Sequence, residues 1–225
     1  MQYNAASSQA QGPRSEQQDA FLSTPDVLCI ADGMGGYAGG SKASAEVIKS
    51  VNNMLPHVPP QAADSAVERI LAITWLSDII TDSNTEICRQ QLASVRLAKM
   101  GSTVVLALRM GNRLHYAHVG DSRLYLLRSG KLQQLTTDHS FSRNVLSRVV
   151  GRNPQYQADH GVLDLKAHDV VMLCSDGVYG VLSDQDIIKA LTAANAQQMC
   201  DDLIKAAAAA STTDNSTAVV LVVNP

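Results

Sequence analysis

The stretch Val27-Leu28-Cys29-Ile30-Ala31-Asp32-Gly33 is a short apolar run that ends in an acidic residue and a glycine. The same arrangement recurs far along the chain, in Val170-Val171-Met172-Leu173-Cys174-Ser175-Asp176-Gly177. Short apolar runs with β-branched residues predict buried strands. Each strand would then deliver a carboxylate from a rigid end, beside a glycine that lets the backbone approach a ligand closely.

Two further acidic steps lie beside predicted strands. Gly120-Asp121-Ser122-Arg123 stands between two of them, and Thr213-Asp214-Asn215-Ser216-Thr217 comes directly before the last one. A single Asp-Gly is most often an ordinary turn, but several acidic strand ends in matching contexts indicate a shared site. Crowded carboxylates repel each other unless a hard cation neutralises them, and oxygen ligands without thiolate or imidazole suit Mg²⁺ or Mn²⁺.

The remaining pattern predicts one α+β domain over residues 1–225. In the first helix we expect Ala45, Ile48, Asn52 and Leu55 on one face, with Val47 and Val51 beside it, and the residues before 27 form a polar lead-in. Two consecutive hairpins imply an antiparallel sheet with segregated helices instead of an alternating βαβ series. Helices are predicted at 41–55, 64–99 (one or two), 184–191 and 196–210, and further strands at 102–109, 113–119, 123–128, 131–135, 170–174 and 217–223.

The composition excludes several classes of protein. The chain has 225 residues, 45% of them hydrophobic, so it can bury a real core and is not disordered. With 18 Lys and Arg against 21 Asp and Glu, the net charge is −3 and no basic stripe stands out, which argues against a nucleic-acid binder. We expect no signal peptide and no membrane insertion, and a cytoplasmic protein. The four cysteines are far apart, so a zinc site or disulfide frame is not expected.

The glycine-rich run after the first strand has an alternative interpretation. Gly33-Met34-Gly35-Gly36-Tyr37-Ala38 fits the G-x-G-x-x-A fingerprint of dinucleotide-binding folds. Asp32 would place a negative charge beside the pyrophosphate, and the region near Asn52 offers no acid for the ribose. The antiparallel hairpins also fit that fold poorly, so a dinucleotide-binding oxidoreductase ranks below the two hypotheses given at the end of this subsection.

From Arg14 to about Val223 the chain resembles the metal-dependent protein serine/threonine phosphatases of the PP2C (PPM) type, in their bacterial single-domain form. The motifs that carry the resemblance follow the order of the family, and together they are far more specific than any one alone. They are Arg14-Ser15-Glu16-Gln17-Gln18-Asp19-Ala20, Ala31-Asp32-Gly33-Met34-Gly35-Gly36, Gly101-Ser102-Thr103, Val119-Gly120-Asp121-Ser122-Arg123, Leu135-Thr136-Thr137-Asp138-His139-Ser140, Cys174-Ser175-Asp176-Gly177 and Asp214-Asn215-Ser216-Thr217.

The resemblance implies a two-sheet antiparallel β-sandwich flanked by helices (α-β-β-α), with a centre of two Mn²⁺ or Mg²⁺ ions at one end. It also implies a role for each matching residue. Asp32 would bridge both ions, Asp176 and Asp214 would complete the first, the Gly33 carbonyl would bind the second, Asp121 would hold a third ion together with Asp176, Asp19 would orient metal-bound water, and Arg14 would clamp the phosphate.

The sequence departs from the family pattern at three places that concern the site. Met34 and Tyr37 stand where relatives carry histidines, which leaves the proton donor to the leaving oxygen unassigned. Gln18 stands where many relatives carry a metal-binding Glu, so we expect a weaker, more water-rich second metal site. Ser140-Phe141-Ser142 runs almost directly into Arg143-Asn144-Val145-Leu146-Ser147-Arg148, so the mobile flap of bacterial relatives is shortened to a small loop and the rim is more open. Among the six histidines, His139 alone lies in a family motif.

The leading hypothesis is hydrolysis of phosphoserine and phosphothreonine in proteins by a water that two metal ions activate, with no phosphoenzyme. The catalytic residues would be Arg14, Asp32 and Asp176. The partners would be phosphorylated proteins and a bacterial Ser/Thr kinase that the enzyme opposes. The alternative is a catalytically weak or silent PP2C-like module that binds phosphoproteins.

Overall fold

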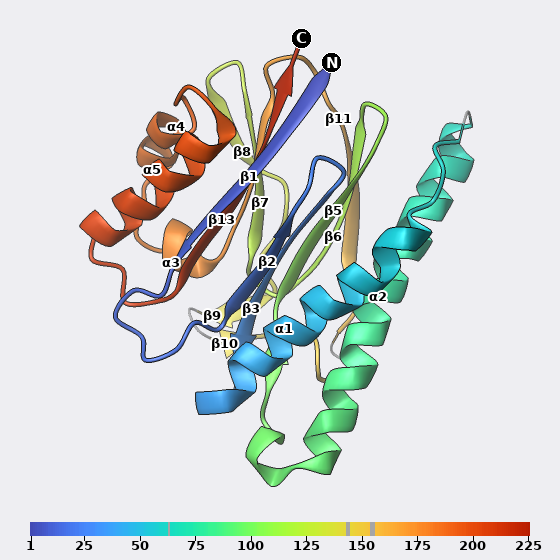
Figure 1. The fold of residues 1–225 in the computed structure, drawn as a ribbon, viewed down its shortest axis with the longest axis vertical. Helices are drawn as coiled ribbons and strands as arrows, with labels where there is room; N and C mark the ends of the chain where they lie inside the picture. The colour runs from blue at the N-terminus through green and yellow to red at the C-terminus, as the bar shows by residue number, and fades with distance from the viewer. Residues whose placement is uncertain (63, 143–144, 154–155) are drawn as a thin grey trace.

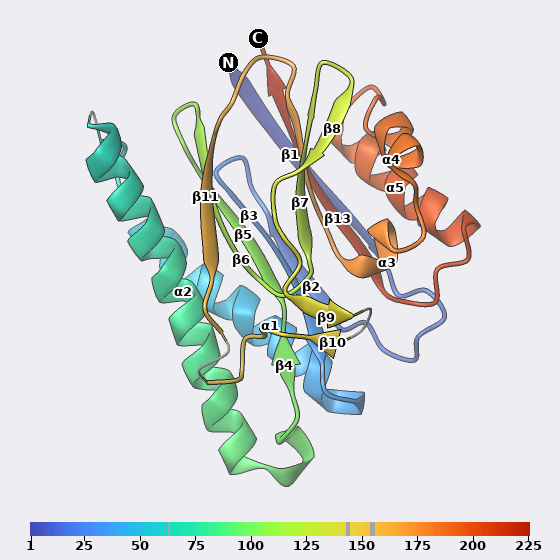
Figure 2. The same cartoon turned by 180° about the vertical axis from the view of Figure 1, so that it is seen from behind.

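The structure is a computed structural model, and it describes residues 1–62, 64–142, 145–153 and 156–225. Two antiparallel sheets pack face to face, and helices cover the outer face of each (Figures 1 and 2). The predicted α+β sandwich with its α-β-β-α layers is therefore confirmed. No described helix is both long enough and apolar enough to cross a membrane.

One sheet has six strands and carries the first of the two Asp-Gly segments. In spatial order its strands are β11 (Asp159–Asp164), β6 (Arg113–Val119), β5 (Val104–Met110), β3 (Val27–Met34) and β2 (Asp19–Ser23), and β4 (Gly101–Ser102) pairs with the end of β3. The predicted hairpin of β5 and β6 is present, and its turn residue Gly111 has a φ of 62° that favours glycine.

The other sheet has five strands and brings the two ends of the chain together. Its order is β1 (Gln2–Ala10), β13 (Ser216–Asn224), β12 (Val170–Cys174), β7 (Arg123–Arg128) and β8 (Lys131–Gln134). A small two-stranded sheet, β9 (Ser140–Ser142) with β10 (Val145–Leu146), lies at the opposite end of the sandwich from both termini (Figure 1).

The central strands are apolar throughout because both of their faces are buried. On β3, Leu28 and Ile30 pack between the sheets, whereas Cys29 and its neighbours on the other face pack under the helices. On β12, Leu173 faces the other sheet and Met172 faces the helices. Because side chains alternate between the two faces of a strand, both strands hold a fixed position in the sandwich. The Asp-Gly that follows each strand therefore lies at a fixed edge.

The helices form the two outer layers. Over the six-stranded sheet lie α1 (Tyr37–Met54), the 3₁₀ turn η1 (Leu55–His57), α2 (Ser65–Ala93) and the 3₁₀ turn η2 (Val95–Leu97); the five-stranded sheet carries α3 (Asp176–Tyr179), α4 (Asp184–Ala190) and α5 (Ala196–Ala209). The single long helix was one of the two possibilities for residues 64–99. Asp64 caps it, because its carboxylate accepts the N–H groups of Ala66 and Val67.

Two predictions about these elements were wrong. The polar lead-in contains strand β1, which pairs with β13 from Gln2 opposite Asn224 to Ala10 opposite Ser216. The predicted face of the first helix is also displaced, because Ala45 and Asn52 are exposed while Val47 and Val51 centre the buried face. Strands β2 and β11 carried too little apolar signal to be predicted.

Candidate active site

Asp32 lies near the end of β3, where the six-stranded sheet meets the pocket. Its register partner on β2 is Asp19, so these two acids are neighbours across the sheet. The Gly33 N–H donates to the Gln18 carbonyl at 3.1 Å, and a Cβ on Gly33 would lie 2.0 Å from the Gly40 carbonyl oxygen. Only glycine fits at this position, which keeps the backbone beside Asp32 close to the start of α1.

The other predicted acids also extend from strand ends. Asp176 begins α3 directly after β12, Asp214 precedes β13, and Asp121 follows β6. A Cβ on Gly177 would lie 1.9 Å from the Asn215 carbonyl oxygen, so glycine allows the Asp176 turn to pack against the Asp214 loop. The chain therefore brings together carboxylates that are far apart in sequence.

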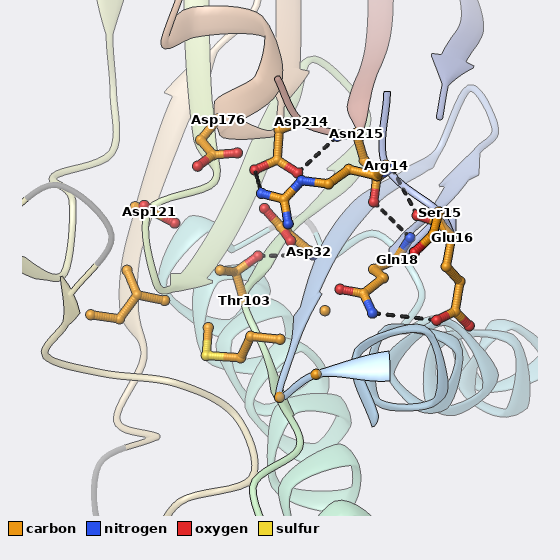
Figure 3. Close-up of a pocket in the computed structure, with 15 residues that line it drawn as sticks. Arg14, Ser15, Glu16, Gln18, Asp32, Thr103, Asp121, Asp176, Asp214 and Asn215 are labelled. Carbon is orange, nitrogen blue, oxygen red and sulfur yellow. Dashed lines mark hydrogen bonds and ion pairs between the residues drawn. The ribbon is translucent and has the colours of Figure 1, made fainter. Parts of the chain in front are cut away.

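Asp32, Asp121, Asp176 and Asp214 surround one pocket of about 480 Å³ (Figure 3). The pocket draws residues from both sheets, since Asp32 belongs to the six-stranded sheet and Asp176 and Asp214 adjoin the five-stranded sheet. The full lining comprises Arg14, Ser15, Glu16, Gln18, Asp32, Gly33, Met34, Gly35, Gly36, Thr103, Asp121, Leu146, Asp176, Asp214 and Asn215.

Asp19 does not line this pocket. Its side chain is 6% exposed, and its Oδ2 accepts hydrogen bonds from Ser175 Oγ and Thr217 Oγ1, each at 2.7 Å. It thus joins β2 to the strands that carry Asp176 and Asp214. The role of Asp19 as an orienter of metal-bound water stays a prediction.

Four acids in or beside the site, Asp19, Asp32, Asp121 and Asp176, have raised pKa values. Burial, followed by repulsion from Asp19, Asp176 and Asp121, raises the pKa of Asp32 well above its ordinary value. Burial, with Asp121 and Asp214 nearby, raises the pKa of Asp176 to about 7. Burial also raises the pKa values of Asp19 and Asp121. Such a cluster is an unfavourable place for several negative charges unless cations accompany them.

The donor set fits hard divalent cations. In the described part of the chain, Asp176 Oδ1 is a buried oxygen without a hydrogen-bond partner. A buried carboxylate oxygen without a partner costs free energy that a bound cation would recover. The oxygen atoms of Asp32, Asp176 and Asp214, with no thiolate or imidazole among the described lining residues, are ligands that Mg²⁺ and Mn²⁺ prefer.

Arg14 carries the positive charge among the described lining residues. Its Nη2 lies 2.5 Å from Asp214 Oδ2, and its Nε donates to the Thr213 carbonyl at 3.0 Å. The side chain is 52% exposed, so it reaches into the mouth of the pocket from the segment between β1 and β2. A guanidinium placed there can grip two phosphate oxygens at once.

Sequence reasoning recognised the Gly101-Ser102-Thr103 motif but gave it no role. Thr103 N–H donates to the Asp32 carbonyl at 2.8 Å, and Thr103 Oγ1 accepts the Asp32 N–H at 3.0 Å. The same hydroxyl lies 2.7 Å from Ser122 Oγ, next to Asp121. Thr103 therefore joins the backbone of the two acidic turns, a role that no pattern of apolar residues reveals.

Asn215 is a second residue whose role was missed. Its Nδ2 donates to the carbonyls of Gln11 and Glu16, and its Oδ1 accepts the Gln18 N–H at 2.8 Å. The side chain thus ties the segment that carries Arg14 to the start of β13. A polar residue beside a predicted metal ligand was the available signal.

A small two-stranded sheet lies at the rim of the pocket, and the shortened flap with its more open rim stays a prediction. Strands β9 and β10 form a small hairpin, Leu146 of β10 lines the pocket, and Phe141 of β9 is 81% exposed. Arg143 and Asn144, which the shortened segment includes, lie outside the described residues. The effect of Gln18 on the second metal site stays a prediction.

Comparison with known proteins identifies relatives over most of the chain. A family model described as protein phosphatase 2C matches residues 10–218. The serine/threonine phosphatase stp of Listeria monocytogenes serotype 4b is 28% identical over 184 residues, which cover 73% of this chain and 71% of the relative. The phosphatase PstP of Mycobacterium tuberculosis is 31% identical over 225 residues, and the match covers 92% of this chain but 42% of that protein.

A solved structure extends the similarity to three dimensions. The catalytic domain of PstP in complex with two manganese ions superposes with a TM-score of 0.87 at 29% identity, over 99% of each chain. The two manganese ions of that structure agree with the oxygen-rich donor set described above. The chain thus belongs to the protein phosphatase 2C family and is a metal-dependent serine/threonine protein phosphatase.

Proposed function

We propose that Asp32, Asp176, Asp214 and the Gly33 carbonyl hold two Mn²⁺ or Mg²⁺ ions in this chain. Asp121, together with Asp176, is the proposed holder of a third ion, and Asp19 the orienter of coordinated water. Such ions supply a nucleophilic water of lowered pKa and stabilise charge on the phosphoryl group. The observation that carries the proposal is the meeting of these carboxylates at one pocket with Asp176 Oδ1 buried and without a partner.

The protein's own residues then bind and orient the phosphate ester. Asp32, Asp176 and Asp214 contribute three negative charges against four positive charges from two divalent ions, so the pocket becomes locally positive and attracts a phosphate dianion. Arg14 exchanges one oxygen of Asp214 for an oxygen of the phosphate and fixes the ester for in-line attack. The more open rim suits phosphorylated side chains that a protein presents on an exposed segment.

The experiment is hydrolysis of an aryl phosphate and of a phosphothreonine peptide, in EDTA and with added Mn²⁺. We expect turnover with Mn²⁺, none in EDTA, and a loss of at least about 100-fold in kcat for Asp176→Asn. This substitution replaces a proposed carboxylate ligand by an amide and removes one of the negative charges that balance the metal ions. Lys131→Gln, which changes an exposed charge on β8 far from the lining residues, is the matched control.

Each contrary outcome has a definite meaning. Activity that chelation leaves unchanged, or that Asp176→Asn retains in full, would contradict the proposed metal ligands. Tight binding of the phosphopeptide without turnover at any Mn²⁺ concentration would instead identify a silent phosphoprotein-binding module.

We further propose that residues 1–225 act as a single phosphatase domain in the cytoplasm and that the substrates include proteins phosphorylated by a bacterial Ser/Thr kinase. Support for one domain comes from Arg14 and Asp214, which lie near opposite ends of the chain and meet in one pocket. Support for a reducing compartment comes from the free thiols of Cys29, Cys88, Cys174 and Cys200. Co-purification of a kinase whose autophosphorylation the enzyme reverses would test the partner.

A further inference from the structure

Behind the carboxylate pocket lies a second cluster of titratable side chains. His118, His139 and Asp159 each place a potential ligand atom within 4.8 Å of the others. The two imidazole rings stack with centroids 4.5 Å apart and planes at 19°. His118 and His139 are 3% and 6% exposed. The arrangement has the composition of a metal site, so its hydrogen bonds decide what it does.

Those hydrogen bonds exclude a cation between the rings. His139 Nδ1 accepts the Gly120 N–H at 3.2 Å, which places the proton of the neutral ring on Nε2. That Nε2 faces Asp159 Oδ2 at 3.1 Å, and Arg148 Nη1 lies 2.7 Å from Asp159 Oδ1. Asp159 therefore already has a donor on each oxygen, and one of them is a guanidinium that would repel a metal ion.

His139 instead binds both backbone groups of Gly120, its N–H and its carbonyl. Besides the contact of Nδ1, the His139 backbone N–H donates to the Gly120 carbonyl at 3.0 Å. Gly120 has a φ of 102°, and a Cβ there would lie 2.6 Å from Thr103 Cγ2. Only glycine therefore fits at this position, where the backbone passes close to Thr103. The next residue is Asp121, one of the acids of the pocket.

The same kind of grip acts on Asp32. Thr103 gives its N–H to the Asp32 carbonyl and accepts the Asp32 N–H with its side chain, as His139 does for Gly120. The Asp32 end of β3 and the Gly120–Asp121 turn are thus each held by a backbone donor and a side-chain acceptor. For Gly120 the acceptor is an imidazole that is itself held at its far end.

His139 also reaches the rim of the pocket. Its carbonyl accepts the Ser147 N–H at 2.8 Å, directly after β10, whose Leu146 lines the pocket. Through Asp159 the ring is also connected to β11 and to Arg148. One buried residue therefore connects the Asp121 turn, through its ring, with the hairpin that borders the site, through its backbone carbonyl.

We propose that His139 is a positioning residue of this phosphatase. Its Nδ1 holds the Gly120–Asp121 turn, its Nε2 is anchored by Asp159, which Arg148 holds in turn, and its carbonyl fixes the β9–β10 hairpin beside the pocket. The inference deepens the proposed function, because it rests on the role given there to Asp121. His139 acts through Gly120 and touches neither the substrate nor the reacting atoms.

Two substitutions separate the two ends of the ring. In His139→Asn the amide oxygen replaces Nδ1 as acceptor for Gly120 but cannot reach Asp159, whereas in His139→Gln the amide nitrogen replaces Nε2 and the acceptor for Gly120 is lost. His160→Asn is the matched control, since His160 is the exposed neighbour of Asp159 on β11 and contacts Ser77. Melting temperatures show that each variant is folded.

The first readout is amide hydrogen exchange at Gly120 and Asp121, which needs no metal. We expect exchange to accelerate at least about 10-fold in His139→Gln and much less in His139→Asn, because only the former leaves a buried N–H without an acceptor. The second readout is Mn²⁺ titration by calorimetry. Its weakest site should lose about 10-fold in affinity in His139→Gln, with most of the affinity retained in His139→Asn.

Equal effects of the two His139 substitutions on exchange, or none, would overturn the proposal. The variant Asp121→Asn keeps this failure distinct from failure of the proposed function. If Asp121→Asn binds Mn²⁺ as the wild type does, then the role of Asp121 is wrong, while the exchange data still decide whether His139 holds the turn. A wild type without Mn²⁺-dependent turnover would contradict the proposed metal centre itself.

Discussion

At the scale of single residues, the described lining of the pocket combines three acids of raised pKa, Asp32, Asp121 and Asp176, with the guanidinium of Arg14. Arg14 is paired with Asp214, and the same guanidinium is proposed to bind the phosphate. We predict that Arg14→Ala raises KM for a phosphothreonine peptide by about 10-fold or more and changes kcat less, since a charge-assisted contact to bound substrate is lost. Arg14→Lys should recover part of the affinity. An effect confined to kcat would mean that Arg14 acts chiefly in the transition state.

The raised pKa of Asp176 has a consequence for the protein without metal. Its pKa is about 7 in the folded protein against an ordinary 3.8, so the folded state binds more protons than the unfolded state between these values and stability falls as pH rises through that window. In EDTA we expect the melting temperature to fall by roughly 4–8 °C from pH 5 to pH 8, for a loss of about 2 kcal/mol.

Asp176→Asn should remove much of this pH dependence, because an amide does not titrate. Thermal melts of both proteins in the same buffers would check it. A wild-type melting temperature that rises over this range relative to the variant would contradict the raised pKa.

A further prediction concerns Thr103, whose hydrogen bonds hold the backbone of Asp32. Thr103→Val keeps the shape but leaves the Asp32 N–H without its acceptor and Ser122 without its partner, which costs about 1–3 kcal/mol. We expect a lower kcat as well, since Asp32 loses one of its two holds. Thr103→Ser, which keeps the hydroxyl, is the control, and an equal loss in both variants would assign the effect to the missing methyl group.

The acids themselves could be predicted from the sequence, whereas their supports could not. Asp32 and Asp176 follow apolar runs whose burial on both faces fixes where the strand ends, so the position of the carboxylate follows from the pattern. Thr103 and His139 act through hydrogen bonds to distant segments, which no local pattern encodes. Their motifs were visible, but the contact partners depend on the packing of two sheets.

At the scale of elements, α2 is fastened to the six-stranded sheet by a buried ion pair. Glu68 is fully buried, and its Oε1 lies 2.9 Å from Arg113 Nε and 3.1 Å from His115 Nε2, both on β6. Trp75 and Ile79 on the same helix pack into the apolar core against the six-stranded sheet. The acidic residue therefore sets the position of the helix along the strand in a way that apolar packing alone would not.

We predict that Glu68→Ala destabilises the protein by about 3–5 kcal/mol, because Arg113 and His115 lose a buried partner. Glu86→Ala removes the surface pair with Arg89 and one of the two acceptors of Gln90 on the same helix, and it should cost clearly less than Glu68→Ala. Urea unfolding of both variants measures the difference, and kcat of the folded protein should change in neither. Equal stabilities would show that the pair does not fasten α2.

Strand β1 shows why some elements escape prediction. Its sequence, Gln2 to Ala10, lacks both apolar alternation and β-branched residues, yet it pairs along its whole length with β13. β13 is almost entirely buried and needs a neighbour on its outer side, so the partner supplies the hydrogen bonds that β1 could not hold alone. The buried face of helix α1 was predicted wrongly for a different reason, because several spacings of its alanines and valines fit a helical face.

At the scale of the whole molecule, the proposed metal centre spans both sheets. Asp32 comes from the six-stranded sheet, and Asp176 and Asp214 adjoin strands of the five-stranded sheet. We predict that Mn²⁺ at about 100 times its Kd stabilises the protein by about 2.7 kcal/mol per site, because binding requires the folded arrangement. Thermal melts with and without EDTA measure this shift, and Asp176→Asn should lose most of it. A shift that survives in that variant would place the ions elsewhere.

The pairing of β1 with β13 sets Gln2 opposite Asn224, at the end of the sandwich away from β9 and β10 (Figure 1). A linker of a few residues could join these ends, and new ends could open in the Ser129–Gly130 turn between β7 and β8. In such a circular permutant β1 and β13 would be a local hairpin instead of the pairing with the longest sequence separation. The contact order would fall and the domain should fold faster, with the active site at the opposite end unaltered.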